Sequence, residues 1–198
     1  MEIRNEEKLG LRMKGDIFMK LGNNLSREEV LNYPDRAFHN IIVNVCSKLV
    51  ASWGCMGNTM GGSLPSINGW GVRTLAVGTG DPLWDPMNPP AETDVQEELE
   101  AELFRKVFVT TTYVLPITFL PTIDRTNIVD FTTTYSAAEA VGPLVEMGLF
   151  GGNYKNDSFP YGSDSLTANG GTMVNYKTFK VINKPPTAQL SVIWRLTF

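Results

Sequence analysis

The sequence is poor in the side chains that most often carry out catalysis. It has one histidine, His39, and two cysteines, Cys46 and Cys55, among 198 residues. A hydrolase needs a nucleophile with a base within hydrogen-bond reach, and this chain shows no such set. Cys46 lies seven residues after His39, so the two could share a helix face, but nothing else points to a thiol enzyme. We therefore expect no catalytic residues, a partly buried helix histidine, and cysteines that act as small buried apolar side chains.

Excess positive charge and long apolar runs are also missing. The formal net charge is −4 and the isoelectric point is near 5.1, so no cationic surface attracts a phosphate backbone. No window approaches the roughly 20 apolar residues that cross a bilayer. The first eight residues are charged and lack the apolar run of a secretory signal. We expect neither nucleic acid nor membrane as a direct partner.

Phosphate-binding and metal-binding motifs are absent as well. Gly78-Thr-Gly80 follows a predicted strand without the lysine of a P-loop, so we interpret it as a tight strand exit. A group of acidic residues lacks the spacing of a calcium loop, and we expect it on the solvent-facing side of a short helix or turn. These residues are Glu92, Asp94, Glu97, Glu98, Glu100 and Glu102. No cofactor and no metal is expected.

The chain divides into an arm and a domain. Residues 1–34 mix charges and hydrophobes without a sustained period, apart from a helical turn at Ser26-Arg-Glu-Glu29, where Ser26 can cap and Glu29 can reach back. We interpret residues 1–34 as an extended arm and 35–198 as one domain. Apolar residues then recur at helical spacing and predict an amphipathic helix near 36–54. Its stripe is Phe38, Ile41, Ile42, Val45, Leu49 and Trp53.

Beyond Gly54 the pattern changes to short strands separated by glycine, proline, asparagine and aspartate. The predicted strands are 72–77, 106–116, 127–135, 145–150, 172–182 and 189–198, with a surface loop at 153–171. The strands 106–116 and 127–135 suit antiparallel neighbours. The last strand alternates most clearly, and we expect the C-terminus to be paired within a sheet. The fold class is therefore mainly β, an antiparallel β-sandwich of about six to eight strands with one helix and the arm.

A series of different motifs follows in a definite order from about residue 38 to the end. They are Asn40-Ile-Ile-Val-Asn44 with Leu49, Leu75-Ala-Val-Gly-Thr-Gly80, Pro90, Thr93, Leu99, Glu102, Arg105, Phe131, Ala137-Ala-Glu139, Gly142-Pro143, Glu146-Met-Gly-Leu-Phe150, Gly171-Thr-Met173, Phe179, Ile182-Asn-Lys184 and Leu190-Ser-Val-Ile-Trp-Arg-Leu-Thr-Phe198. In this order and spacing the chain resembles a family of tailed-bacteriophage virion structural proteins, which are associated with the tail, tail fibre or collar.

The resemblance implies a non-enzymatic building block of a symmetric ring or trimer in the neck, collar or tail. Its partners would be further copies of itself and other virion proteins, such as fibres, in a virion assembled in the host cytoplasm. It supplies no catalytic residues. Rings of this kind rest on aromatic and methionine anchors in loops and arms. The candidate interface residues are Phe18, Met19, Trp70, Trp84 and Met87, although packing against the chain's own domain is an equally good interpretation.

An alternative is a receptor- or glycan-binding module at a tail tip or fibre. Trp84 lies between Asp81 and Asp85, and loops with an aromatic ring and carboxylates bind cations and sugars. In that case the Trp84 loop and the loop 153–171 would form the site for a host-surface glycan.

Overall fold

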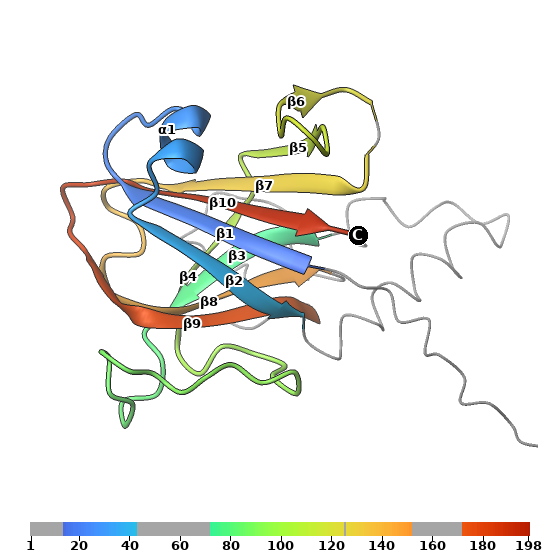
Figure 1. Cartoon of the computed structure of the whole chain (residues 1–198). Helices are drawn as coiled ribbons and strands as arrows, with labels where there is room; N and C mark the ends of the chain where they lie inside the picture. The colour runs from blue at the N-terminus through green and yellow to red at the C-terminus, as the bar shows by residue number, and fades with distance from the viewer. Residues whose placement is uncertain (1–13, 43–71, 125, 152–171) are drawn as a thin grey trace, which may run out of the picture.

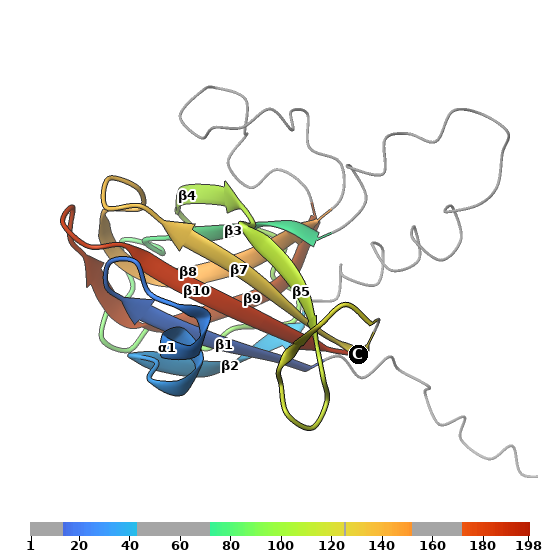
Figure 2. The same cartoon turned by 90° about the horizontal axis from the view of Figure 1, so that it is seen from above.

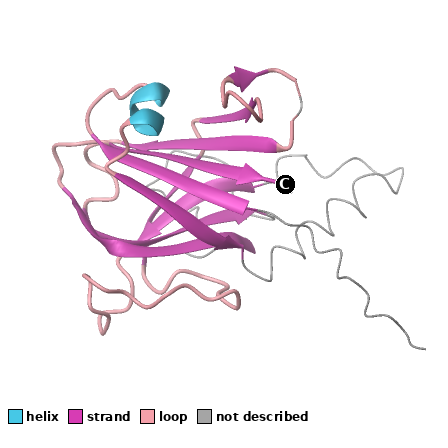
Figure 3. Cartoon of the chain, viewed as in Figure 1, coloured by secondary structure: helices cyan, strands magenta, loops and turns pink. Residues whose placement is uncertain are grey.

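The computed structural model describes residues 14–42, 72–124, 126–151 and 172–198. These residues form ten antiparallel strands and one short helix, which is the cyan element in Figure 3. In chain order (Figure 1) they are β1 (Lys14–Leu21), α1 (Arg27–Asn32), β2 (Arg36–Ile42), β3 (Val72–Gly78), β4 (Glu102–Val107), β5 (Thr110–Val114), β6 (Pro121–Thr122), β7 (Ile128–Tyr135), β8 (Gly142–Gly151), β9 (Thr172–Lys184) and β10 (Leu190–Thr197). The predicted antiparallel β-sandwich is confirmed, with more strands than expected.

The strands form two layers in the order β4-β3-β8-β9-β2-β1-β10-β7-β5-β6. One layer contains β4, β3, β8 and β9, and the other contains β2, β1, β10, β7, β5 and β6. The layers are linked where β2 pairs with β9, at Ile41 with Tyr176 and Ile42 with Asn175. They are linked again where β4 leads directly into β5. The predicted strand 106–116 is divided between β4 and β5, because the chain crosses between the layers at Phe108. The centres of the Phe108 and Phe131 rings lie 4.8 Å apart.

The core lies between the layers, and β10 contributes most clearly to it. Leu190, Val192, Trp194 and Leu196 alternate along β10, and each is buried in the main apolar cluster. The strand pairs with β1 on one side and β7 on the other, so the expected pairing of the C-terminus within a sheet is confirmed. Its opposite face is also buried, since Ile193 is fully covered and α1 packs over β10.

The arm boundary at residue 34 is wrong. Residues 14–21 form β1, which lies between β2 and β10 inside the sheet. Ile17 and Met19 point into the core, while Asp16, Phe18 and Lys20 occupy the half-buried positions that alternate with them. This alternation is too short, and too mixed with charge, to stand out in the sequence. Residues 1–13 of the predicted arm lie outside the described residues.

The predicted turn at Ser26 is confirmed as the start of α1. The hydroxyl of Ser26 accepts a hydrogen bond from the Glu29 amide at 3.2 Å, and the Glu29 carboxylate accepts one from the Ser26 amide at 2.8 Å. These two bonds satisfy amides that the first helical turn leaves without partners. The bond from the Ser26 amide is the largest cause that lowers the pKa of the Glu29 carboxyl group.

The predicted helix near 36–54 is wrong over its first residues. Arg36–Ile42 is a strand, β2, and it pairs with β1. The pairing extends from Arg36, opposite Met19, to Asn40, opposite Gly15. Sheet pairing outweighs the helical spacing here, because β1 offers a complete ladder to the segment. His39 is therefore not a buried helix residue. Its side chain is 79% exposed, and its Nδ1 lies 2.6 Å from the Asp16 carboxylate. Residues 43–54, with Cys46, lie outside the described residues, as do Cys55 and the predicted loop 153–171.

Candidate protein-interaction site

The most prominent surface feature is the hairpin formed by β5 and β6. The 17 residues from Val107 to Ile123 contain no charged side chain. Figure 2 shows the hairpin standing out from the sandwich near the end of β10. We call residues 109–123 the apolar hairpin. Its large exposed side chains are Val109, Tyr113, Leu115, Ile117, Phe119, Leu120 and Ile123. Ile117 is 91% and Ile123 98% exposed, so this surface is apolar where surfaces are normally charged.

The tip of the hairpin has a defined backbone. The Leu115 amide donates to the Leu120 carbonyl at 2.9 Å, and the Phe119 amide donates to the Leu115 carbonyl at 2.9 Å. Phe119 has a positive φ of 54°, which a turn of this tightness requires. Pro121 lies in β6, at the sheet edge, and proline has no amide to donate to an added strand. The hairpin therefore offers side chains to a partner more than backbone hydrogen bonds.

A buried ion cluster beneath the hairpin holds it in place. Asp130 on β7 is fully buried, and Arg195 on β10 donates to both of its carboxylate oxygens at 2.7 and 2.9 Å. Arg27 on α1 donates to the same carboxylate and also to the Phe119 carbonyl at 3.3 Å. The Arg195 guanidinium lies 4.6 Å from the centre of the Phe119 ring. The hairpin tip is thus bonded to both α1 and the sheet.

The apolar area of the hairpin is large for one surface feature. The exposed fractions of its seven large apolar side chains add up to about four complete side chains. Complete burial of one such side chain contributes about 1.5–3 kcal/mol of free energy. At about 25 cal/mol per Å², this corresponds to roughly 60–120 Å² of apolar surface. The hairpin therefore exposes roughly 250–500 Å². Patches of this size on a folded chain are often functional.

The predicted interface residues lie elsewhere. Met19 is buried in the core and has no surface to offer a partner. Phe18 is half-buried, with its ring centre 5.6 Å from the Arg195 guanidinium. Trp84 is half-buried and Met87 is 48% exposed. Trp70 lies outside the described residues. The hairpin is not predicted from the sequence, because 106–116 has the pattern of a half-buried strand. The sequence signal for the hairpin is the long uncharged run with two prolines.

Trp84 packs against its own domain. The ring lies over Gly80, where a Cβ would come within 2.6 Å of it, and Gly80 has a φ of 68°. The flanking carboxylates are also engaged locally, since Asp81 accepts from the Leu83 amide and Asp85 from the Met87 amide. The second contact is the largest cause that lowers the pKa of Asp85. Trp84 and its two aspartates therefore do not converge on a shared binding surface.

A second polar cluster surrounds Glu146 on β8. Its carboxylate is fully buried and accepts four hydrogen bonds of 2.9–3.1 Å, from the amides of Gly80, Glu100 and Ala101 and from the Tyr176 hydroxyl. Burial and this carboxylate raise the pKa of Tyr176. The cluster ties both ends of the segment 79–101, which hangs below β8 and β9 in Figure 1, to the sheet. Because each bond comes from the chain itself, we interpret the cluster as structural.

The acidic residues do not form one solvated helix face. The segment from Thr93 forms turns, and β4 begins at Glu102. Glu92 pairs with Lys177 at 2.5 Å, and Glu102 pairs with the buried Arg105 at 2.6 Å. Asp94, Glu97 and Glu98 are exposed, as expected. Among the described residues, no group of three or more histidine, cysteine, aspartate or glutamate side chains could hold a metal ion.

Comparison of the chain with protein-family models and with curated proteins finds no match. Within the described part of the chain, no helix has the length and apolar character to span a membrane.

Proposed function

We propose that this chain is a non-enzymatic structural protein of a tailed-bacteriophage virion. It belongs to the neck, collar or tail, assembles in a symmetric ring, and connects or anchors other tail components such as fibres. The observation that supports an assembly role is the apolar hairpin. It projects from the sandwich, carries no charged side chain, and is held at its tip by the hydrogen bond from Arg27. The virion assignment is supported by the ordered motifs from residue 38 onward.

The hairpin has the size that an interface core needs. A standard interface buries about 800 Å² on each partner, of which about 57% is apolar. The apolar requirement is therefore about 450 Å² per partner. The roughly 250–500 Å² on the hairpin meets most of it. The bond from Arg27 to the hairpin tip also means that little ordering is needed on binding, which favours affinity.

The glycan-binding alternative has less support than assembly. It needs an exposed aromatic face with convergent polar groups, whereas Trp84 is half-buried against Gly80 and its neighbouring aspartates accept from nearby amides. Saturable binding of a host-surface glycan that Trp84→Ala abolishes would reverse this preference.

The test is the mass of the purified full-length chain, measured by light scattering and native mass spectrometry. We expect an oligomer, with six or twelve copies for a neck or collar protein and three for a fibre protein. The double variant Ile117→Asp/Ile123→Asp should raise the dissociation constant at least tenfold, because it buries charge in an apolar contact. Val95→Asp is the matched control, since Val95 is 70% exposed but lies outside the hairpin.

The virion assignment has a separate test. Particles of the phage that encodes the chain are labelled with an antibody against it and imaged by electron microscopy. Label at the neck, collar or tail is the expected result. Particles that carry no label, or a chain that stays monomeric at high concentration, would overturn the proposal.

A further inference from the structure

The exposed apolar surface of the described residues is concentrated in the apolar hairpin. Half of the large apolar side chains that these residues expose lie in it. Outside the hairpin, the segment 79–101 exposes the most, with Leu83, Met87 and Val95. That segment contains seven acidic residues and no basic one, so two copies of it repel each other. Among the described residues, the hairpin is therefore the one apolar face that a second copy can offer without such repulsion.

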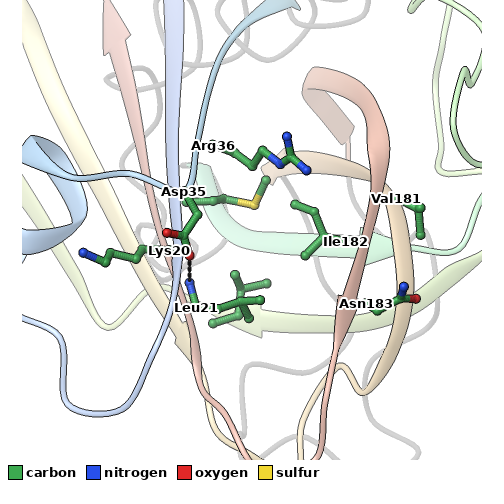
Figure 4. A pocket seen from close by; sticks show the side chains of 9 residues that line it. Lys20, Leu21, Asp35, Arg36, Val181, Ile182 and Asn183 are labelled. Carbon is green, nitrogen blue, oxygen red and sulfur yellow. Dashed lines mark hydrogen bonds between the residues drawn. The ribbon is translucent and has the colours of Figure 1, made fainter.

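The pocket between the two layers does not offer a second apolar face. It has a volume of about 440 Å³ and is lined by residues of β1, β2, β9 and β10 (Figure 4). Its apolar lining is covered, since Met19 and Leu190 are 1% and Ile182 8% exposed. Asp35 and Arg36, which also line it, are exposed. An apolar side chain that entered would have to displace water from these charged groups, which is unfavourable.

The absence of charge in the hairpin suits a contact with its own copy. Where two copies meet through the same element, a side chain beside the symmetry axis faces its own counterpart. A charged side chain there would face a like charge, which opposes association. Residues 107–123 contain no charged side chain, and Lys106 before them is paired with Glu139 at 2.6 Å. Contacts between different proteins commonly match complementary charges, and the hairpin has none to match.

We propose that the apolar hairpin packs against the apolar hairpin of a second copy of this chain. Ile117, which lies in the turn at the tip and is 91% exposed, is placed beside the symmetry axis. This inference rests on the proposed assembly function and specifies its contact. Each copy contributes the same roughly 250–500 Å² of apolar surface, against the about 450 Å² that a standard interface needs from each partner.

The contact is compatible with each of the expected assemblies. In an assembly of three copies, it gathers the hairpins around the three-fold axis. In an assembly of six or twelve, it joins copies in pairs across two-fold axes, where the same patch of each copy meets itself.

The experiment is photo-cross-linking in the assembled full-length protein. A benzophenone amino acid replaces Ile117, and ¹⁴N- and ¹⁵N-labelled chains are assembled together. Trypsin cleaves after Lys106 and Arg125 and releases residues 107–125 as one peptide. The expected product is this peptide linked to its own counterpart, with a mass between those of the two uniformly labelled pairs. Such a link forms only between copies. The same cross-linker at Val95 is the control and should give no link to residues 107–125.

A charge-exchange experiment tests whether the hairpin faces itself. Ile117→Lys and Ile117→Asp change an exposed side chain, so both variants should fold. Each alone should weaken self-association by roughly tenfold or more, because like charges then meet across the contact. An equimolar mixture should associate roughly tenfold more tightly than either variant alone, because opposite charges meet. Val95→Lys with Val95→Asp is the matched control pair and should associate like the wild type, alone or mixed.

Failure of this inference differs from failure of the assembly proposal. An oligomer without links from position 117 to residues 107–125 of another copy overturns the hairpin-to-hairpin contact. So does a mixture that associates no more tightly than its two components. Both results leave the assembly proposal standing. A wild-type chain that is monomeric at high concentration overturns both.

Discussion

The carboxylate of Asp130 lies 2.5 Å from the guanidinium of Arg27, although 103 residues separate them in the sequence. Arg27 begins the only helix of the described residues, and the same nitrogen also bonds to the Phe119 carbonyl at the hairpin tip. One side chain thus joins α1, β7 and the hairpin. The position of the proposed contact surface is therefore coupled to the stability of the sandwich beneath it.

Asp130→Asn should destabilise the protein strongly. The change leaves the guanidiniums of Arg27 and Arg195 together without a negative charge, in a place where Arg195 is 7% exposed. Removing one member of a buried ion cluster typically costs about 3–5 kcal/mol. We expect a loss of this order in the free energy of unfolding, measured by urea denaturation. Faster amide hydrogen exchange at Leu115 to Leu120 should accompany it, because the tip loses its anchor.

The matched control for this change is Asp124→Asn. Asp124 follows the hairpin but is exposed. The free energy of unfolding of the Asp124→Asn variant should therefore stay within about 0.5 kcal/mol of the wild-type value. Equal effects of the two substitutions would show that the Asp130 cluster does not support the hairpin.

Gly78→Ala should destabilise the segment that follows β3. A Cβ at this position would lie 2.4 Å from a carboxylate oxygen of Glu146 and 2.6 Å from the Ala101 carbonyl. Neither neighbour can move without breaking its hydrogen bonds, so we expect a loss of about 1–3 kcal/mol, as for other overpacked sites. In a Glu146→Ala background the penalty should shrink, because the closer contact is gone. Strict additivity in this double-mutant cycle would argue against the clash.

The sequence predicts the fold best where one strand face is buried along its whole length. In β10 the alternation of Leu190, Val192 and Trp194 is long, so β10 is predicted correctly. Its one charged residue, Arg195, lies on the opposite face and leaves the alternation clear. β1 carries the same alternation in a shorter form, and Asp16 and Lys20 conceal it. In β2 the spacing of Phe38, Ile41 and Ile42 also fits a helix, so the choice depends on the distant strands that pair with it.

The Glu146 cluster and the apolar hairpin are harder to predict, because they depend on contacts between distant segments. Glu146 begins the motif Glu146-Met-Gly-Leu-Phe150, but its role appears only when amides from residues 80, 100 and 101 converge on it. The hairpin depends on where a strand leaves its sheet. The sequence indicates a tight strand exit at Gly78-Thr-Gly80, but the reason for its glycines is the close approach of Glu146 and Trp84.

Thr133→Val should stabilise the protein. Thr133 is fully buried, and within the described part of the chain its hydroxyl has no hydrogen-bond partner. An unsatisfied buried polar group costs about 1–3 kcal/mol, and valine replaces the hydroxyl with a methyl group of similar shape. We expect the free energy of unfolding to rise by about 1 kcal/mol. Thr111→Val, at an exposed position of the neighbouring strand, is the control and should change it little. A loss of stability in Thr133→Val would mean that the hydroxyl is bonded in solution.

Acid should weaken the turn between β7 and β8 through Glu139. Burial alone raises the pKa of Glu139, but the bonds from Lys106 at 2.6 Å and the Ser136 amide at 2.8 Å outweigh it, so the pKa lies below the ordinary value of 4.5. A carboxylate with a lowered pKa in the folded state stabilises the protein fully above its ordinary pKa. That contribution is lost as the pH falls through the folded value.

The free energy of unfolding should therefore fall between about pH 5 and pH 3, and Glu139→Gln should fall less steeply. The difference between wild type and variant is expected to be largest above pH 5 and to narrow on acidification. Glu98→Gln, which changes an exposed carboxylate in the segment before β4, is the matched control and should keep the wild-type slope. If Glu139→Gln also keeps that slope in urea titrations across this range, the ion pair with Lys106 does not contribute to stability.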